Sequence, residues 1–183
     1  MGTVTILPRS RPLRRSDLES MPDDGHRYEL IDGALVVTPA PSYRHQRGVG
    51  RLFTLLDSHC PAELVVLFAP FDVALGDDTV MQPDLLVARR EEVTERDLPA
   101  APVLAVEVLS PSTRRIDLTL KRSRFEAAGC AAYWVFDPDE PALTVWELVE
   151  GTYARVGRVV DEQMHHAQRP FAVDIRPANL VMD

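Results

Sequence analysis

The sequence predicts one α/β (α+β) domain in which a mixed central sheet is flanked by helices. Its 183 residues fit one domain, and its 45% hydrophobic and 26% charged residues are typical of a globular chain. The apolar pattern gives a helix, several strands, a second helix, another strand and an antiparallel meander, which indicates this fold class. No apolar run approaches the roughly 20 residues that span a bilayer. With only two cysteines, the chain suits a reducing compartment, so we expect a cytoplasmic protein without membrane contact.

The N-terminal part predicts an arm, a short helix and a hairpin. Residues 1–15 are expected to form a flexible arm, and residues 16–183 the single domain. Ser16 is the expected N-cap of a helix over residues 16–21, because Glu19 follows at capping-box spacing. In residues 28–37 the pair Asp32-Gly33 separates two apolar runs, which predicts a β-hairpin.

Residues 42–59 predict a helix with Ser42 as its N-cap. His45 lies in the middle of an apolar face formed by Val49, Leu52 and Leu56. Two interpretations of this histidine remain open: a hydrogen-bonded core residue or a site residue. Three arginines follow the flank of the helix at Arg44, Arg47 and Arg51.

Most remaining elements are predicted strands. The first four are Leu64–Phe68, Phe71–Leu75, Asp84–Ala88 and Val103–Leu109. The fourth is almost wholly apolar, so we expect a central strand that is buried on both faces. A helix over Arg114–Ala128 should end at Gly129. The later expected strands are Ala132–Phe136, a hairpin of 142–149 with 152–160, and Phe171–Ile175.

The charge of the chain argues against a strongly basic nucleic-acid-binding domain. Its formal net charge is −8, with acids concentrated in the middle and at the end. Two parts of the chain are nevertheless basic. Residues 1–51 hold eight Arg against six acids, and residues 111–130 hold five basic residues against two acids. Each of them includes the start of a predicted helix. Such a distribution suits a site that holds cations and meets a polyanion, but ordinary surface charge explains it as well.

Glu107 is the most informative residue, because an ionised carboxylate inside an apolar strand is unfavourable unless it is paired or binds a metal. Asp84 follows Pro83 at the start of another apolar strand. If these two strands are neighbours, both carboxylates project from one end of the sheet. Carboxylate oxygens suit Mg²⁺ or Mn²⁺, whereas a structural salt bridge is the simpler alternative.

Lys121 is a polar residue on the inward arc of the predicted helix 114–128. Leu118, Leu120 and Phe125 mark this arc, and Asp117 lies one helical turn before Lys121. An i,i+4 ion pair between Asp117 and Lys121 is the plain interpretation. Such a pair normally lies on an exposed face, so a site role for Lys121 is the favoured interpretation.

Four segments together resemble the Uma-type putative restriction endonuclease family, which belongs to the PD-(D/E)XK nuclease superfamily. They are Gln82-Pro83-Asp84-Leu85-Leu86-Val87, Val106-Glu107-Val108-Leu109-Ser110-Pro111-Ser112-Thr113-Arg114, Asp117-Leu118 with Lys121, and Ala132-Tyr133-Trp134-Val135-Phe136-Asp137-Pro138. Tyr28-Glu29-Leu30-Ile31-Asp32-Gly33 is similar to the family's N-terminal signature. The resemblance covers roughly residues 16–175 and implies a restriction-endonuclease-like fold with an added N-terminal hairpin and C-terminal meander.

The resemblance also implies a Mg²⁺- or Mn²⁺-dependent endonuclease that hydrolyses phosphodiester bonds of DNA and forms a homodimer. Asp84 and Glu107 match its metal-binding carboxylates. Leu109 stands where the superfamily has a lysine, so Lys121 from the following helix is the expected replacement. The expected supporting residues are Glu29, His45 and Asp117.

Five arginines are candidates for contacts with nucleic-acid phosphates: Arg44, Arg47, Arg51, Arg114 and Arg115. The missing lysine at position 109 keeps a second function open, a non-catalytic nucleic-acid- or protein-binding member of the same fold. A structural domain whose acids form ordinary salt bridges is the third.

Overall fold

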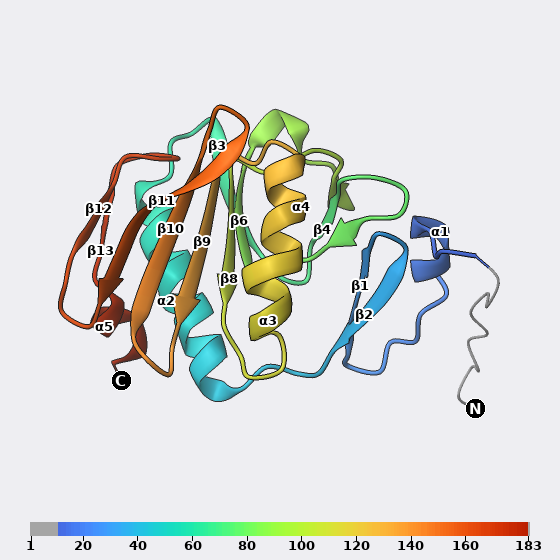
Figure 1. The fold of residues 1–183 in the computed structure, drawn as a ribbon, viewed down its shortest axis with the longest axis horizontal. Coiled ribbons are helices and arrows are strands. Elements are labelled where there is room, and N and C mark those ends of the chain that lie inside the picture. Colours follow the sequence, from blue (N-terminus) through green and yellow to red (C-terminus); the bar gives the residue numbers. More distant parts are fainter. Residues whose placement is uncertain (1–10, 183) are drawn as a thin grey trace.

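A six-stranded mixed sheet forms the centre of the protein (Figure 1). The computed structural model describes residues 11–182. In spatial order the strands are β11 (Thr152–Val160), β10 (Ala142–Val149), β9 (Ala132–Asp137), β8 (Leu104–Val108), β6 (Leu85–Arg89) and β3 (Leu64–Phe68). β8 and β9 run parallel, and the other neighbours are antiparallel. The predicted mixed central sheet is therefore confirmed, with β8 buried along its whole length.

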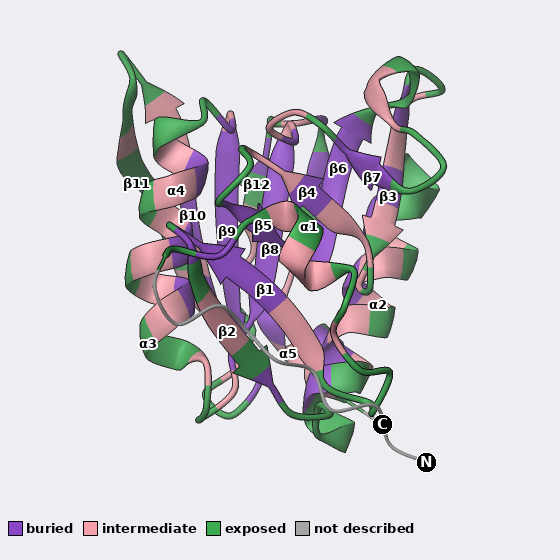
Figure 2. Ribbon diagram, turned by 90° about the vertical axis from the view of Figure 1, so that its right-hand side faces the viewer, coloured by how far each residue is buried: buried purple, intermediate pink, exposed green. Residues whose placement is uncertain are grey.

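Two smaller sheets accompany the central one. The five-stranded sheet has the order β2 (Ala34–Thr38), β1 (Arg27–Ile31), β5 (Val80–Met81), β4 (Asp72–Ala74) and β7 (Asp97–Leu98). β12 (His165–Ala167) pairs with β13 (Val173–Ile175). Figure 2 shows β1 and β2 lying across the central strands, whose purple colour marks them as buried.

Helices cover both faces of the central sheet. They are α1 (Arg15–Leu18), α2 (Tyr43–His59), α3 (Arg114–Ile116), α4 (Arg122–Ala127) and α5 (Pro177–Val181), with a 3-10 turn η1 (Arg90–Glu92) and a π-helical turn η2 (Asp117–Lys121). One apolar core joins α2, α5 and β13 to one face of the sheet, and a second joins α4 and the five-stranded sheet to the other. No helix within residues 11–182 is long and apolar enough to cross a membrane.

The predicted helix over residues 42–59 agrees with α2 to within one residue. Ser42 is its N-cap, and the Ser42 side chain accepts a hydrogen bond from the His45 backbone N–H. Gly48 lets this helix approach the sheet closely, because a Cβ atom there would lie 3.0 Å from the Phe136 ring. The approach brings the first turn of α2 close to the ends of the central strands.

The hairpins were also predicted correctly. β1 and β2 are joined by Asp32 and Gly33, whose φ angles of 53° and 73° are left-handed, as a tight hairpin turn requires. β10 and β11 are joined at Glu150-Gly151.

Two predictions of local structure were wrong, and two short strands were missed. The first helix runs over Arg15–Leu18 with Arg14 as N-cap, so Ser16 does not cap it; Asp17 instead accepts the Arg14 N–H. The predicted continuous helix 114–128 is interrupted by η2. The two-residue strands β5 and β7 were not expected, because segments this short carry little periodicity.

Residues 1–10 of the expected arm lie outside the described residues. The arm's remaining residues contact the domain: the Leu13 N–H donates to the Gly33 carbonyl at 2.9 Å, and the Arg15 N–H to the Asp77 carbonyl at 2.7 Å.

Candidate functional site

Asp84 and Glu107 lie opposite each other on neighbouring strands. Leu85 of β6 pairs with Val106 of β8, so the same register extended by one residue places Asp84 opposite Glu107. Opposed residues of an antiparallel pair point to the same face of a sheet. Both carboxyl groups are buried, with 3% and 1% of their residues' surface exposed. The sequence-based expectation that the two strands are neighbours is therefore correct.

Three donors hold the Asp84 carboxylate. The Val108 N–H and His45 Nε2 donate to Oδ2 at 2.8 and 3.0 Å, and Arg27 donates to Oδ1 at 3.0 Å. Burial alone would raise the pKa of Asp84. The hydrogen bond from His45 and the attraction of His45, Arg27 and Lys121 outweigh it and lower the pKa to about 2. Asp84 is thus ionised at neutral pH and fixed in orientation.

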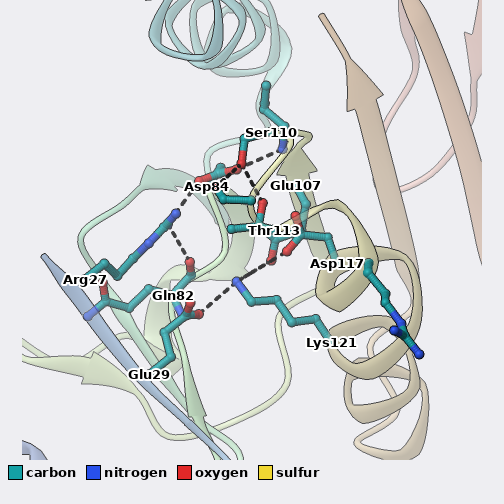
Figure 3. A network of polar contacts seen from close by, with 12 residues as sticks. Arg27, Glu29, Gln82, Asp84, Glu107, Ser110, Thr113, Asp117 and Lys121 are labelled. Carbon is teal, nitrogen blue, oxygen red and sulfur yellow. Dashed lines mark hydrogen bonds and ion pairs between the residues drawn. The ribbon is translucent and has the colours of Figure 1, made fainter. Parts of the chain in front are cut away.

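Lys121 lies at the centre of the site and is the only lysine in the sequence, whose other basic residues are all arginine. Its Nζ atom lies 2.9 Å from Glu29 Oε1, 3.2 Å from Glu107 Oε1 and 3.8 Å from Asp117 Oδ1. Figure 3 shows the three carboxyl groups pointing toward this nitrogen from separate elements. With 2% of its surface exposed, Lys121 is not part of a surface pair.

Burial and charge oppose each other at this cluster. Burial alone would lower the pKa of Lys121, but Glu107, Glu29 and Asp117 raise it above its usual value. Burial, together with the nearby carboxylates, raises the pKa of Glu107 well above its usual value, although Lys121 opposes the shift. Lys121 is therefore charged at neutral pH, whereas ionisation of Glu107 is disfavoured.

The π-helical turn η2 places both Asp117 and Lys121 in the site. It begins at Asp117 and ends at Lys121, and both residues are buried. The buried Tyr133 hydroxyl donates to the Asp117 carbonyl at 2.8 Å, which holds this turn against β9. Single π-helical turns occur frequently at functional sites.

Replacing Asp117 with asparagine should stabilise the fold at neutral and alkaline pH. Burial raises the pKa of Asp117 to about 6 from the ordinary 3.8, although Lys121 and Thr113 oppose the shift. Ionisation of Asp117 therefore lowers the free energy of unfolding by its full amount above about pH 6. It has no effect below the pKa of the unfolded state. We expect Asp117→Asn to gain up to about 3 kcal/mol at about pH 8 and nothing below about pH 4.

Urea unfolding across this pH range measures the effect. Asp57→Asn, which changes an exposed aspartate on α2, is the control and should leave stability unchanged. A gain in Asp117→Asn that is equal at both ends of the range would contradict the role of burial.

Arg27 and Gln82 belong to the site, although sequence reasoning assigned neither a role. Arg27 donates to the Gln82 carbonyl at 3.0 Å as well as to Asp84, and the Gln82 N–H donates to Glu29 Oε1 at 2.7 Å. The period of two along a strand was a signal for Arg27, because residues 27 and 29 of β1 share one face.

A cleft of about 560 Å³ opens beside Asp84. His45, Arg27 and Gln82 also line it, and its outer wall includes the partly exposed Phe68. Glu107 and Lys121 do not border it. A molecule in this cleft would therefore meet Asp84 and its supporting donors first.

The five candidate nucleic-acid-binding arginines lie in different surroundings. Arg44 lies 3.6 Å from Asp139, and Arg114 is paired with Asp137. Arg115 is exposed. Arg47 and Arg51 line a second groove along α2.

The oxygen donors of the site suit a hard divalent cation, although no group of three His, Cys, Asp or Glu side chains within residues 11–182 is already arranged to hold a metal ion. Four carboxyl groups, Glu29, Asp84, Glu107 and Asp117, face only two strong bases, Arg27 and Lys121. Glu29 Oε2 and Asp117 Oδ1 are buried without a hydrogen-bond donor. The excess of acids and the unsatisfied oxygens fit an added cation.

Comparisons with known proteins identify the family and support the fold. The family model described as Uma2, putative restriction endonuclease, matches residues 15–179. A crystal structure of a putative nuclease belonging to DUF820 from Anabaena variabilis is 17% identical, with a TM-score of 0.73, and the match covers 93% of this chain and 98% of that chain. No curated protein matches. Because the family model spans most of the sequence, from α1 to α5, the chain belongs to the Uma2 family of putative restriction endonucleases.

Proposed function

We propose that this chain is a divalent-metal-dependent endonuclease that hydrolyses phosphodiester bonds of DNA. One observation carries the proposal: Asp84, Glu107 and Lys121, from three separate elements, meet in one buried polar cluster next to a cleft. Family membership supports a nuclease but does not by itself specify the metal, the nucleic acid or the residues.

Each residue has a definite role in this proposal. Asp84 and Glu107 are the residues that would hold Mg²⁺ or Mn²⁺. Such an ion would polarise a phosphate oxygen and lower the pKa of a bound water. Arg27 and His45 orient Asp84 through the hydrogen bonds described above. Lys121 supplies the positive charge that orients the attacking water or offsets charge developing on the phosphate.

The surrounding residues support this core. Glu29 and Asp117 hold the ammonium group of Lys121 in place. The proposal includes contacts to backbone phosphates from the candidate arginines on α2 and at the start of α3. It also takes the chain to act as a homodimer in the cytoplasm, a reducing compartment that suits its two free cysteines, Cys60 and Cys130.

A direct assay tests the proposal. Purified protein is incubated with plasmid and with single-stranded DNA in the presence of Mg²⁺, Mn²⁺ or EDTA, beside an Asp84→Ala variant. We expect cleavage by the wild type only with a divalent ion and none by the variant. Equal cleavage by two proteins purified free of contaminating nuclease would overturn the assignment of Asp84.

One observation favours a second function, a non-catalytic nucleic-acid- or protein-binding member of the fold. Lys121 already neutralises the carboxylates around it, and Glu107 does not border the cleft. Cation-dependent stabilisation and nucleic-acid binding without any cleavage would support this second function against the first.

Glu107→Gln separates a metal ligand from a structural ion pair. Because burial raises the pKa of Glu107, removal of its charge should change the free energy of unfolding little. A cation present at 100 times its dissociation constant should stabilise the wild type by about 2.7 kcal/mol, or about 5–10 °C in melting temperature. We expect this cation-induced shift to vanish in Glu107→Gln.

The control is Glu126→Gln, which changes a partly exposed glutamate on α4 and should keep the shift. If Glu107→Gln unfolds and the cation never stabilised the wild type, Glu107 is half of a structural ion pair.

A further inference from the structure

A groove on the α2 side of the sheet collects arginines from two distant parts of the sequence. Its volume is about 710 Å³, and α2, β13 and α5 contribute its walls. Arg47 and Arg51 extend from α2, whereas Arg176 is the N-cap residue of α5. In Figure 1 the short α5 lies beside α2, on the side of the sheet opposite β1 and β2.

Each of the three guanidinium groups in this groove has a buried donor without an acceptor. The Nε atoms of Arg47, Arg51 and Arg176 are each buried without a hydrogen-bond partner. Arg51 forms no side-chain hydrogen bond or ion pair with residues 11–182, the part of the chain that the structure describes. Within the same residues, the side chain of Arg47 donates a single long bond of 3.4 Å, to the Met182 carbonyl. Buried donors without partners are unfavourable, so an acceptor from outside would satisfy them.

Little negative charge competes with these arginines. Among residues 11–182, Asp174 is the one carboxylate that lines the groove, and it lies 2.7 Å from His166. Glu162 contacts Arg176 at 3.3 Å but is largely exposed. The groove is therefore a local concentration of positive charge on a chain whose net charge is −8.

We propose that this groove binds a phosphate group of the nucleic-acid strand that is held at Asp84. Guanidinium forks match phosphate oxygens in shape and charge. Gln46 lines both this groove and the cleft beside Asp84, so the two are adjacent. His45, which donates to Asp84, lies six residues before Arg51, or about 9 Å along α2. A strand with one phosphate near Asp84 thus reaches the groove with a neighbouring phosphate.

The proposal rests on the proposed function for the identity of the ligand, but it does not require cleavage. Its test is therefore a binding measurement in EDTA, where no divalent ion is available. Fluorescence anisotropy with dye-labelled single- and double-stranded DNA compares the wild type with Arg51→Gln/Arg176→Gln. The matched control is Arg155→Gln/Arg158→Gln, which removes two exposed arginines of β11 that lie on the opposite face of the sheet.

We expect the groove variant to bind DNA about tenfold more weakly than the wild type. The slope of log K against log salt concentration should become shallower by about 0.7–0.9, because one phosphate contact is lost. The β11 variant should keep the wild-type affinity. Inorganic pyrophosphate should compete with DNA for the wild type and bind it in calorimetry, but not the groove variant. Arg51→Gln alone, which removes a guanidinium group that has no partner among residues 11–182, should show an intermediate loss and an unchanged melting curve.

Three results would overturn the proposal. Unchanged affinity and slope in the groove variant would remove the groove from the binding surface, even if the wild type cleaves DNA. Equal losses in the β11 variant would show a general charge effect. Binding of pyrophosphate without any binding of DNA would overturn the assignment to a nucleic-acid strand. Pyrophosphate and DNA binding in the groove by a wild type that never cleaves would instead contradict the proposed function and leave the groove in place.

Discussion

Replacement of Lys121 with methionine is expected to lower the free energy of unfolding by about 3–5 kcal/mol at about pH 8 and to abolish cleavage. Methionine keeps most of the side-chain volume and removes the charge. Glu29, Glu107 and Asp117 then face one another without the ammonium group that lies 2.9–3.8 Å from each of them. The expected loss of cleavage is roughly 10²–10³-fold in rate, which is typical when one positioned charge partner of the transition state is removed.

The pH dependence of this loss follows from the carboxyl groups that remain. Without Lys121, their protonation becomes favourable at higher pH, so the destabilisation should be smaller at about pH 5 than at about pH 8. Divalent cations should stabilise the variant, since they occupy the space between the same carboxylates. Urea unfolding at both pH values, with and without Mn²⁺, measures these effects.

Arg124→Met is the matched control, because Arg124 lies on the following helical turn and pairs with the half-exposed Asp32. That loss should be no more than about 1 kcal/mol. A Lys121→Met protein as stable and as active as the wild type would contradict both the burial of Lys121 and its proposed role. Because Lys121 is the only lysine, selective ¹⁵N-lysine labelling gives one side-chain signal that reports directly on this site.

Local signals in the sequence were sufficient for most of the central fold. The Ser42 cap, the Asp32-Gly33 turn and the continuous apolar run before Leu109 each act over a few residues, and each structure formed where it was predicted. The five-stranded sheet was missed because β5 and β7 are only two residues long, and because β5 joins the sheet to the distant β1 and β7 pairs with β4 across more than 20 residues. Long-range pairing of this kind leaves almost no periodic pattern.

The candidate site was predictable to the extent that its residues conflict with their local pattern. Glu107 interrupts an apolar strand, and Lys121 interrupts an apolar arc, so both were found. Arg27 and Gln82 conflict with nothing nearby, and only the tertiary structure brings them to Asp84 and Glu29. The π-helical turn was missed because a pattern taken at 100° per residue assumes a regular α-helix.

Asp84→Asn is expected to reduce the rate of DNA cleavage by about three orders of magnitude, since metal-ion catalysis supplies several kcal/mol and each 1.36 kcal/mol corresponds to about tenfold in rate. The substitution keeps the shape of the side chain. The carboxylate accepts from Arg27, His45 and the Val108 N–H with two charged oxygens. Asparagine offers one neutral oxygen in their place. The orientation and the charge of the site are therefore lost together.

The same substitution should also destabilise the fold in a pH-dependent way. The pKa of Asp84 is lowered to about 2 from the ordinary 3.8, so its ionised form stabilises the folded state above the unfolded value, and this contribution is lost as the pH falls toward 2. We expect Asp84→Asn to lose about 2 kcal/mol at neutral pH and progressively less in acid. Cleavage must therefore be measured at a temperature at which circular dichroism shows the variant to be folded.

Asp97→Asn distinguishes a loss of activity from a loss of stability. Asp97 is a buried aspartate of β7 that pairs with Arg15 and accepts from Thr94. β7 is an edge strand of the five-stranded sheet, whereas β8, which carries Glu107, belongs to the central sheet. Its replacement should also destabilise the protein but leave the rate of cleavage unchanged. If both variants lose stability and neither loses activity, Asp84 is a structural ion-pair partner of Arg27 and His45, and the catalytic centre lies elsewhere. If only Asp84→Asn loses activity, the buried cluster at the ends of β6 and β8 carries the chemistry.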